Sequence, residues 1–324
     1  MRKQKLISLV SIASAVLALT FLLTACGGGG GGGSLSRIEL RASTGGEAGT
    51  YYACGTALAD ILKGSAAIDI TVNTSGGSKS NIQLVNSSNA DIAFAQSDIC
   101  HDAYNGTATF NGERTENFYA VAALYTEVCQ LVVRPGSGIA SVEDLAGKRV
   151  SIADTGSAAE YNARQILAAY GLGVEDVTAQ NLSVSASAAA LRDGTLDAFF
   201  CTLAAPNATL TELADSGMEI ISIDTEHYEA LVAEYPYYVT YTIPAGTYTG
   251  IDTDIETVGV KSILIARREL EDEAVARLAK ALLDNASAIG EAVPRTAGLT
   301  VENITEGITI PLHPGVAGVY GAEG

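Results

Sequence analysis

Short apolar strands alternate with helices along this chain, and a turn rich in glycine, serine or threonine joins each strand to the next helix. These turns read "STGGEAG" at 43–49, "NTSGGSK" at 73–79 and "ADTGS" at 153–157. We also expect two strands within 118–134 and one at 180–186. Strands that alternate with helices favour parallel sheets covered by helices. The pattern therefore predicts an α/β fold.

The length of the chain bounds its domain organisation. Its 324 residues allow one large or two medium domains with a proper core. No linker rich in proline or serine interrupts the alternating pattern. We therefore expect two α/β lobes, with 36–132 and 257–324 forming lobe 1 and 133–256 forming lobe 2. The strands that cross between the lobes, near 131–134 and 257–261, would be the hinges around a ligand cleft.

The first 25 residues have the features of an export signal. A basic start, "MRKQK", precedes a long apolar run and the sequence "LTAC" that ends at Cys26. This resembles the lipobox of bacterial lipoproteins, in which the cysteine is lipidated. We expect 1–25 to be a signal peptide, Cys26 to carry lipid, and the glycine-rich segment 26–35 to be a flexible tether. The protein would then be exported and anchored on the outer face of the cytoplasmic membrane. An uncleaved transmembrane anchor is the alternative.

Composition narrows the function further. The net charge of −18 argues against nucleic acid, because affinity for phosphates comes from lysine and arginine. Three scattered histidines make a metal site built on histidine unexpected, and no cofactor motif is evident. After export, four cysteines allow three complete disulfide pairings, or each acts as a small buried hydrophobic residue. These are Cys54, Cys100, Cys129 and Cys201.

The tetrapeptide Asp154-Thr155-Gly156-Ser157 admits more than one interpretation. It spells the catalytic sequence of aspartic proteases, which need a second carboxylate nearby. The second candidate, Asp215, lies in a "DSG" that is better read as a helix end, and a helical pattern follows Ser157. The turn instead suits an anion, because the first N–H groups of a helix lack partners within it. An ordinary turn with Ser157 as N-cap is the alternative for this turn taken alone.

The three glycine-rich turns together favour a ligand site. In open α/β sheets, ligands bind beyond the carboxyl ends of the strands, so these turns can converge on one cleft. Tyr51 and Tyr52 would add aromatic surface and hydroxyls, and Gln96 with Ser97 would contact an amine or a hydroxyl. The turns match neither a dinucleotide fingerprint nor a phosphate-binding P-loop. We therefore expect a small anionic or zwitterionic solute as the ligand.

Long segments of the chain resemble one receptor family. "STGGEAGTYYACGTALAD", "NTSGGSKSNIQLVNSSNADIAFAQSD", "SIADTGSAAEYNARQIL", "YPYYVTYTIPAGTYTG" and "PLHPGVAGVYGAEG" look like the TAXI solute receptors of TRAP transporters, in order and over nearly all of 37–324. The resemblance implies a two-lobed type II periplasmic-binding-protein fold. It also implies capture of a small organic acid or amino acid such as glutamate for a TRAP permease, with no catalysis. Departures occur at 53–55, at 202–206 near the expected cleft, and in the tail.

The resemblance and the turns together give a set of expected ligand-binding residues. Lobe 1 would line the cleft, and the turn at 155–157 in lobe 2 would hold the ligand carboxylate. A receptor of the same fold that serves an ABC importer or a sensor kinase is the alternative, and an exported hydrolase is a more distant one. The expected site residues are Thr44, Gly45, Gly46, Thr50, Tyr51, Tyr52, Gly77, Ser78, Asn81, Gln96, Ser97, Thr155, Gly156 and Ser157.

Overall fold

The computed structural model describes residues 36–47 and 49–321. The chain divides into two compact units, Met1–Ser36 and Arg37–Gly324, and the fold below is that of the second unit. The predicted signal peptide (1–25), Cys26 and the tether (26–35) lie outside the described residues. Within the described ranges, no helix has both the length and the apolar character needed to span a membrane.

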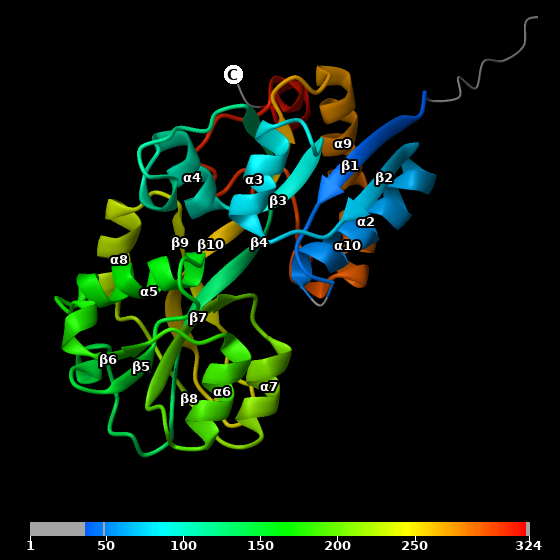
Figure 1. Ribbon diagram of the computed structural model, residues 1–324. Coiled ribbons are helices and arrows are strands. Elements are labelled where there is room, and N and C mark those ends of the chain that lie inside the picture. The colour runs from blue at the N-terminus through cyan, green and yellow to red at the C-terminus, as the bar shows by residue number, and fades with distance from the viewer. Residues whose placement is uncertain (1–35, 48, 322–324) are drawn as a thin grey trace, which may run out of the picture. The chain divides into compact units, whose positions relative to one another are not determined.

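Within the described residues, ten strands form one mixed sheet, with the order β2-β1-β3-β10-β4-β7-β5-β6 (Figure 1). Strand β8 pairs with β4, and β9 pairs with β10. The parallel pairs are those that the alternating sequence predicts, such as β1 with β2 and β5 with β7. The strands are β1 (Ile38–Ser43), β2 (Ile68–Asn73), β3 (Ile92–Gln96), β4 (Phe118–Val133), β5 (Arg149–Ser151), β6 (Thr178–Gln180), β7 (Ala198–Leu203), β8 (Glu219–Ile221), β9 (Tyr238–Ile243) and β10 (Ile255–Arg267).

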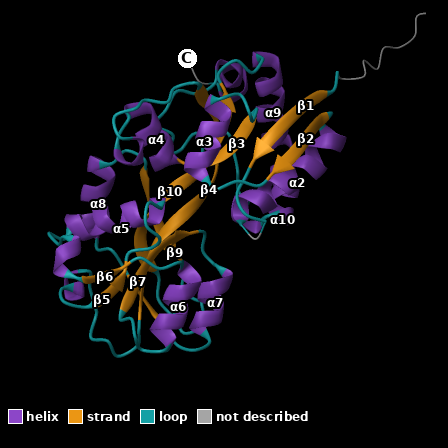
Figure 2. Ribbon diagram, in the orientation of Figure 1, coloured by secondary structure: helices purple, strands orange, loops and turns teal. Residues whose placement is uncertain are grey.

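Helices cover both faces of the sheet (Figure 2). We call β1–β3 with α2–α4 and α9–α11 the first half, and β5–β9 with α5–α8 the second half. The α-helices are α2 (Thr50–Ser65), α3 (Ser78–Asn86), α4 (Ser97–Asn105), α5 (Ala158–Ala169), α6 (Val184–Arg192), α7 (Ala208–Ala214), α8 (Thr225–Glu234), α9 (Asp272–Asp284), α10 (Ala286–Ala292) and α11 (Ala317–Tyr320). The 3₁₀ turns are η1 (Ala108–Phe110), η2 (Glu143–Leu145), η3 (Val174–Asp176), η4 (Pro294–Thr296) and η5 (Pro314–Val316).

Two long strands, β4 and β10, connect the halves (Figure 1). Strand β4 pairs with β10 from Phe118 to Val128 and with β7 from Val128 to Val133. The expected pair of strands at 118–134 is therefore wrong, because the segment is one strand of 16 residues. An unbroken run of strand-forming residues serves two partners in succession, which local sequence does not reveal.

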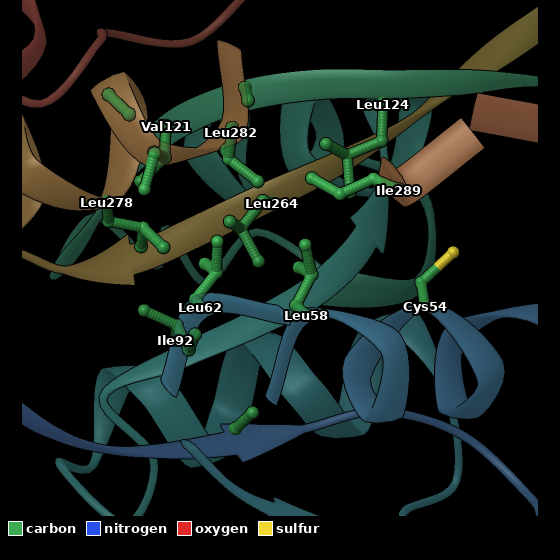
Figure 3. Close-up of a cluster of buried hydrophobic side chains, with 14 of the residues drawn as sticks. Cys54, Leu58, Leu62, Ile92, Val121, Leu124, Leu264, Leu278, Leu282 and Ile289 are labelled. Carbon is green, nitrogen blue, oxygen red and sulfur yellow. The ribbon is translucent and has the colours of Figure 1, made fainter. Parts of the chain in front are cut away.

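The core of the first half lies between α2 and α9 (Figure 3). Leu58 and Leu62 from α2 and Leu278 from α9 pack here with exposed fractions of at most 2%. Complete burial of a leucine stabilises a fold by about 1.5–3 kcal/mol. The four cysteines within the described residues are buried and free, so each is a small hydrophobic residue and forms no disulfide: Cys54, Cys100, Cys129 and Cys201.

The same arginine–aspartate arrangement occurs once in each half. In the first half, the backbone N–H and Nε of Arg41 donate to Asp91 Oδ2, each at 2.9 Å. In the second half, the backbone N–H and Nε of Arg149 donate to Asp197 Oδ2, at 3.0 and 2.9 Å. Burial raises the pKa of Asp91, but hydrogen bonds from Arg41 and Arg267 outweigh this and lower it to about 2. Corresponding positions of the two halves are therefore built alike.

The prediction of a strand at 180–186 is also wrong. Strand β6 ends at Gln180, and α6 begins at Val184. Ser183 caps this helix, and its hydroxyl accepts from the N–H of Ala186 at 3.3 Å. A serine cap before a run of alanines favours helix over strand, which outweighs the alternating pattern of "SVSAS".

Candidate functional site

Three adjoining cavities lie where the turns of the first half meet 203–207 and η4. Their volumes are about 230, 330 and 440 Å³. Thr50 lines the cavities of 230 and 440 Å³. Arg295 lines the cavities of 330 and 440 Å³. We call the three together the cleft, and the 230 Å³ part the central cavity. The central cavity is lined by Gly45, Gly49, Thr50, Tyr51, Gly77, Ser78, Gln96, Tyr125, Glu127, Leu203, Ala204 and Asn207.

Two helices of the first half begin at this cavity. Their N-caps are Gly49 for α2 and Gly77 for α3, and neither provides a side-chain cap. Gly77 has φ +90°, a conformation that favours glycine. Because no cap side chain is present, the first N–H groups of both helices depend on other acceptors or on a ligand.

Hydrogen bonds connect the polar side chains of this wall. The Ser78 hydroxyl lies 3.3 Å from the Tyr51 hydroxyl and accepts from the Gln96 backbone N–H at 3.1 Å. The Tyr51 ring stacks on Phe94 with centroids 5.6 Å apart. These contacts fix the positions of three predicted residues around one space.

Glu127, on β4, contributes a carboxylate to the central cavity. Its Oε2 accepts from Gln96 Nε2 at 2.5 Å, and its Oε1 lies 3.5 Å from the Tyr125 hydroxyl that donates to it. Burial raises the pKa of Glu127, against hydrogen bonds from Gln96 and two tyrosines and the positive charge of Arg295. Glu127 was not among the predicted site residues, although a single acid inside an otherwise mostly apolar strand was a signal for it.

Arg295, in η4, reaches both sides of the cleft. Its Nη1 donates to Thr50 Oγ1 at 2.8 Å, and its Nη2 donates to the carbonyl of Pro206. These two bonds leave three of the five guanidinium N–H donors without a protein acceptor among the described residues. No motif in the sequence singled out Arg295.

Of the predicted site residues, Gly45, Thr50, Tyr51, Gly77, Ser78 and Gln96 line the central cavity. Three others are buried and bonded within the protein. Asn81 Nδ2 donates to the carbonyls of Thr44 and Phe94, at 2.5 and 2.7 Å. The Ser97 hydroxyl donates to the Tyr237 carbonyl at 3.2 Å. These contacts hold the turns in place, and direct ligand contact by Thr44, Asn81 and Ser97 stays a prediction.

The remaining predicted residues, Gly46, Tyr52 and 155–157, do not line the central cavity. Ser157 is the N-cap of α5, as the alternative for this turn predicts, and it accepts from the Glu160 N–H at 3.1 Å. Glu160 Oε2 in turn accepts from the Gly156 N–H at 2.6 Å. The Gly156 N–H therefore already donates to a carboxylate of the protein, that of Glu160. A ligand that binds this N–H must displace Glu160. The expectation that the turn at 155–157 holds the ligand carboxylate stays a prediction.

A fully buried carboxylate, Asp98, links the two halves. Asp98 is fully buried at the start of α4, and its Oδ2 accepts from Asn162 Nδ2 of α5 at 3.0 Å. Asn162 Oδ1 accepts from the Thr202 hydroxyl at 2.9 Å. Burial raises the pKa of Asp98 to about 7, against the hydrogen bonds that it accepts. This carboxyl is therefore poised to titrate near neutral pH.

Residues 42–324 match the NMT1-like family. The structure is similar to a TctC solute binding protein from Polaromonas, at 16% identity and a TM-score of 0.55, over 81% of this chain and 89% of that one. It is also similar to the periplasmic aliphatic sulphonate binding protein SsuA from Escherichia coli, at 15% identity and a TM-score of 0.51, over 88% and 83%. These likenesses confirm the predicted α/β fold of periplasmic binding proteins.

Proposed function

Because the chain belongs to the NMT1-like family, we propose that it is an extracytoplasmic receptor that captures a small organic acid or amino acid, such as glutamate, and performs no chemistry. One observation carries this proposal. The cleft is lined by residues from both halves, and Arg295 bonds to Thr50 on one side and Pro206 on the other. In a ligand cleft, a charged side chain with available donors orients a ligand of opposite charge.

We propose that Arg295 holds the carboxylate of the solute. A guanidinium presents a planar fork of donors that matches a carboxylate. The glycine-capped starts of α2 and α3 add amide donors and partial positive charge. The turn at 155–157 would contribute from the second half after Glu160 releases the Gly156 amide.

The proposed lobes, 36–132 with 257–324 and 133–256, would close over the solute by bending β4 and β10. These strands pair with strands of both halves, so a change at 131–134 and 257–261 would move one half as a body. Closure would exclude water and strengthen the charged contacts.

We propose the TAXI subfamily and a TRAP permease as the partner, with a lipid on Cys26 holding the protein at the outer face of the cytoplasmic membrane. The sequence resemblance supports the subfamily and the permease, and the "LTAC" motif supports the lipid anchor. A TRAP permease gene next to this one is the expected finding. Genes for an ABC importer or a sensor kinase in that position would favour the alternative receptor.

A thermal-shift screen tests the receptor function. We expect at least one amino acid or small carboxylic acid to raise the melting temperature by about 5 °C at 100 times its dissociation constant, because only the native state binds it. Glucose serves as the uncharged control and should give no shift. A flat response to every amino acid, dicarboxylate and sulfonate tested would contradict the proposal.

A further inference from the structure

The Glu127 carboxylate has no ion-pair partner among the described residues, although the positive charge of Arg295 acts on it from farther away. It lines the central cavity, and its hydrogen-bond partners, Gln96 Nε2 and the hydroxyls of Tyr125 and Tyr51, are all neutral. Among the described residues, no lysine, arginine or histidine forms an ion pair with Glu127. A charge in such surroundings is costly unless an opposite charge comes close, and the raised pKa of Glu127 reflects that cost.

Gln96 supplies a second acceptor at the same place. Gln96 is a lining residue of the cavity and is 7% exposed, and its side chain directs Nε2 to Glu127. Its Oε1 is buried and has no hydrogen-bond partner among the described residues. Buried acceptors are satisfied in nearly all native structures, so an unsatisfied one at a cavity wall indicates a donor that arrives with a ligand.

The two acceptors together define the chemistry of that donor. A protonated primary amine carries a positive charge and three N–H donors, and it has no acceptor that would repel Glu127 or Gln96 Oε1. A metal ion fits less well, because the described residues hold no group of three or more histidine, cysteine, aspartate or glutamate side chains that could bind one.

We propose that Glu127 and Gln96 bind the protonated amino group of the solute, so that this receptor selects amino acids over the corresponding acids without an amine. The inference rests on the proposed receptor function and narrows its ligand class. The solute then lies between charges of opposite sign, with its amine at Glu127 and its carboxylate at Arg295. A volume of about 230 Å³ beside Thr50 suits a small amino acid.

Titration calorimetry with matched ligands tests the proposal. L-Glutamate and glutarate share two carboxylates and differ in the amine, as do L-2-aminobutyrate and butyrate. We expect the amino acid of at least one pair to bind at least 100-fold more tightly than its partner. Equal or tighter binding of the acids without an amine would overturn the amine site and leave the receptor function intact. No binding by any amino acid, carboxylate or sulfonate would overturn the receptor function itself.

Two variants localise the effect. Glu127→Gln should weaken binding of the amino acid by about 30-fold or more, because it removes one partner of a desolvated charge pair, and Gln96→Leu should weaken it by several-fold. Glu273→Gln changes the net charge equally on the exposed surface of α9 and should leave the affinity unchanged. A melting temperature near that of the parent protein establishes that each variant is folded. Unchanged amino-acid affinity in either folded site variant would overturn the assignment.

Discussion

Arg295→Met is expected to weaken binding of the solute by about 100-fold or more. Arg295 offers unused guanidinium donors at the cleft, and it also connects Thr50 to the Pro206 carbonyl across it. Removing one partner of a desolvated charge pair costs about 2–5 kcal/mol, and each 1.4 kcal/mol is a tenfold change in affinity. Methionine keeps most of the volume of the side chain, so the change isolates the charge and the donors.

Calorimetry measures this effect, with Arg192→Met as the control. Arg192 is an exposed residue in the last turn of α6, so its replacement makes the same change in net charge away from the cleft. The control should bind as the parent protein does. An Arg295→Met protein that melts normally and binds with undiminished affinity would place the carboxylate elsewhere, and the turn at 155–157 would be the first alternative.

The stability of the protein is expected to fall as the pH rises from about 4 to about 7, in part because of Asp98. Its native pKa of about 7 lies above the ordinary value near 4, so the folded state binds a proton that the unfolded state releases. The stabilisation is fully present below the unfolded pKa and is lost as the pH passes the folded one. The contribution of this group is up to about 4 kcal/mol. The negative charges of Asp102 and Glu127 also raise the pKa of Asp98.

Urea unfolding of the parent protein and of Asp98→Asn, at several values of pH, isolates this contribution. The stability of Asp98→Asn relative to the parent should rise by up to about 4 kcal/mol between pH 4 and pH 7.5, because asparagine does not titrate. Asp215→Asn, at an exposed position after α7, should follow the parent. A constant difference between Asp98→Asn and the parent over this range would mean that Asp98 stays ionised in the folded protein.

The local parts of the fold followed from the sequence. Periodicity and turn residues predict β1, α2, α3 and the strand-to-helix turns, because each depends on residues close together in the chain. The length of β4 did not follow, since one strand and two consecutive strands have the same residue preferences. The N-cap at Ser157 was the alternative interpretation of its turn, beside the expected ligand contact. Glu160 lies three residues after Ser157, which is the spacing of a capping box, and its carboxylate accepts from the Gly156 N–H. That spacing was a signal in the sequence that this turn is capped by the protein itself.

The candidate site was predictable only in its first-half wall. The turns can be recognised by their glycine and serine residues. Arg295, in contrast, bonds to Thr50, which lies 245 positions away in the sequence. No local pattern encodes such a contact, because it depends on how α10 and η4 return to the start of α2. Glu127 needed a different inference, that an acid within a buried strand must have a partner.

A crystal structure of the protein with the amino acid that gives the largest thermal shift tests the central claim most directly. We predict that the amino acid extends from the central cavity into the adjoining part of the cleft that Arg295 lines, with its ammonium within hydrogen-bond distance of Glu127 and its carboxylate on the Arg295 guanidinium. An amino acid bound outside the cleft, or a central cavity that holds only water at saturating ligand, would contradict it.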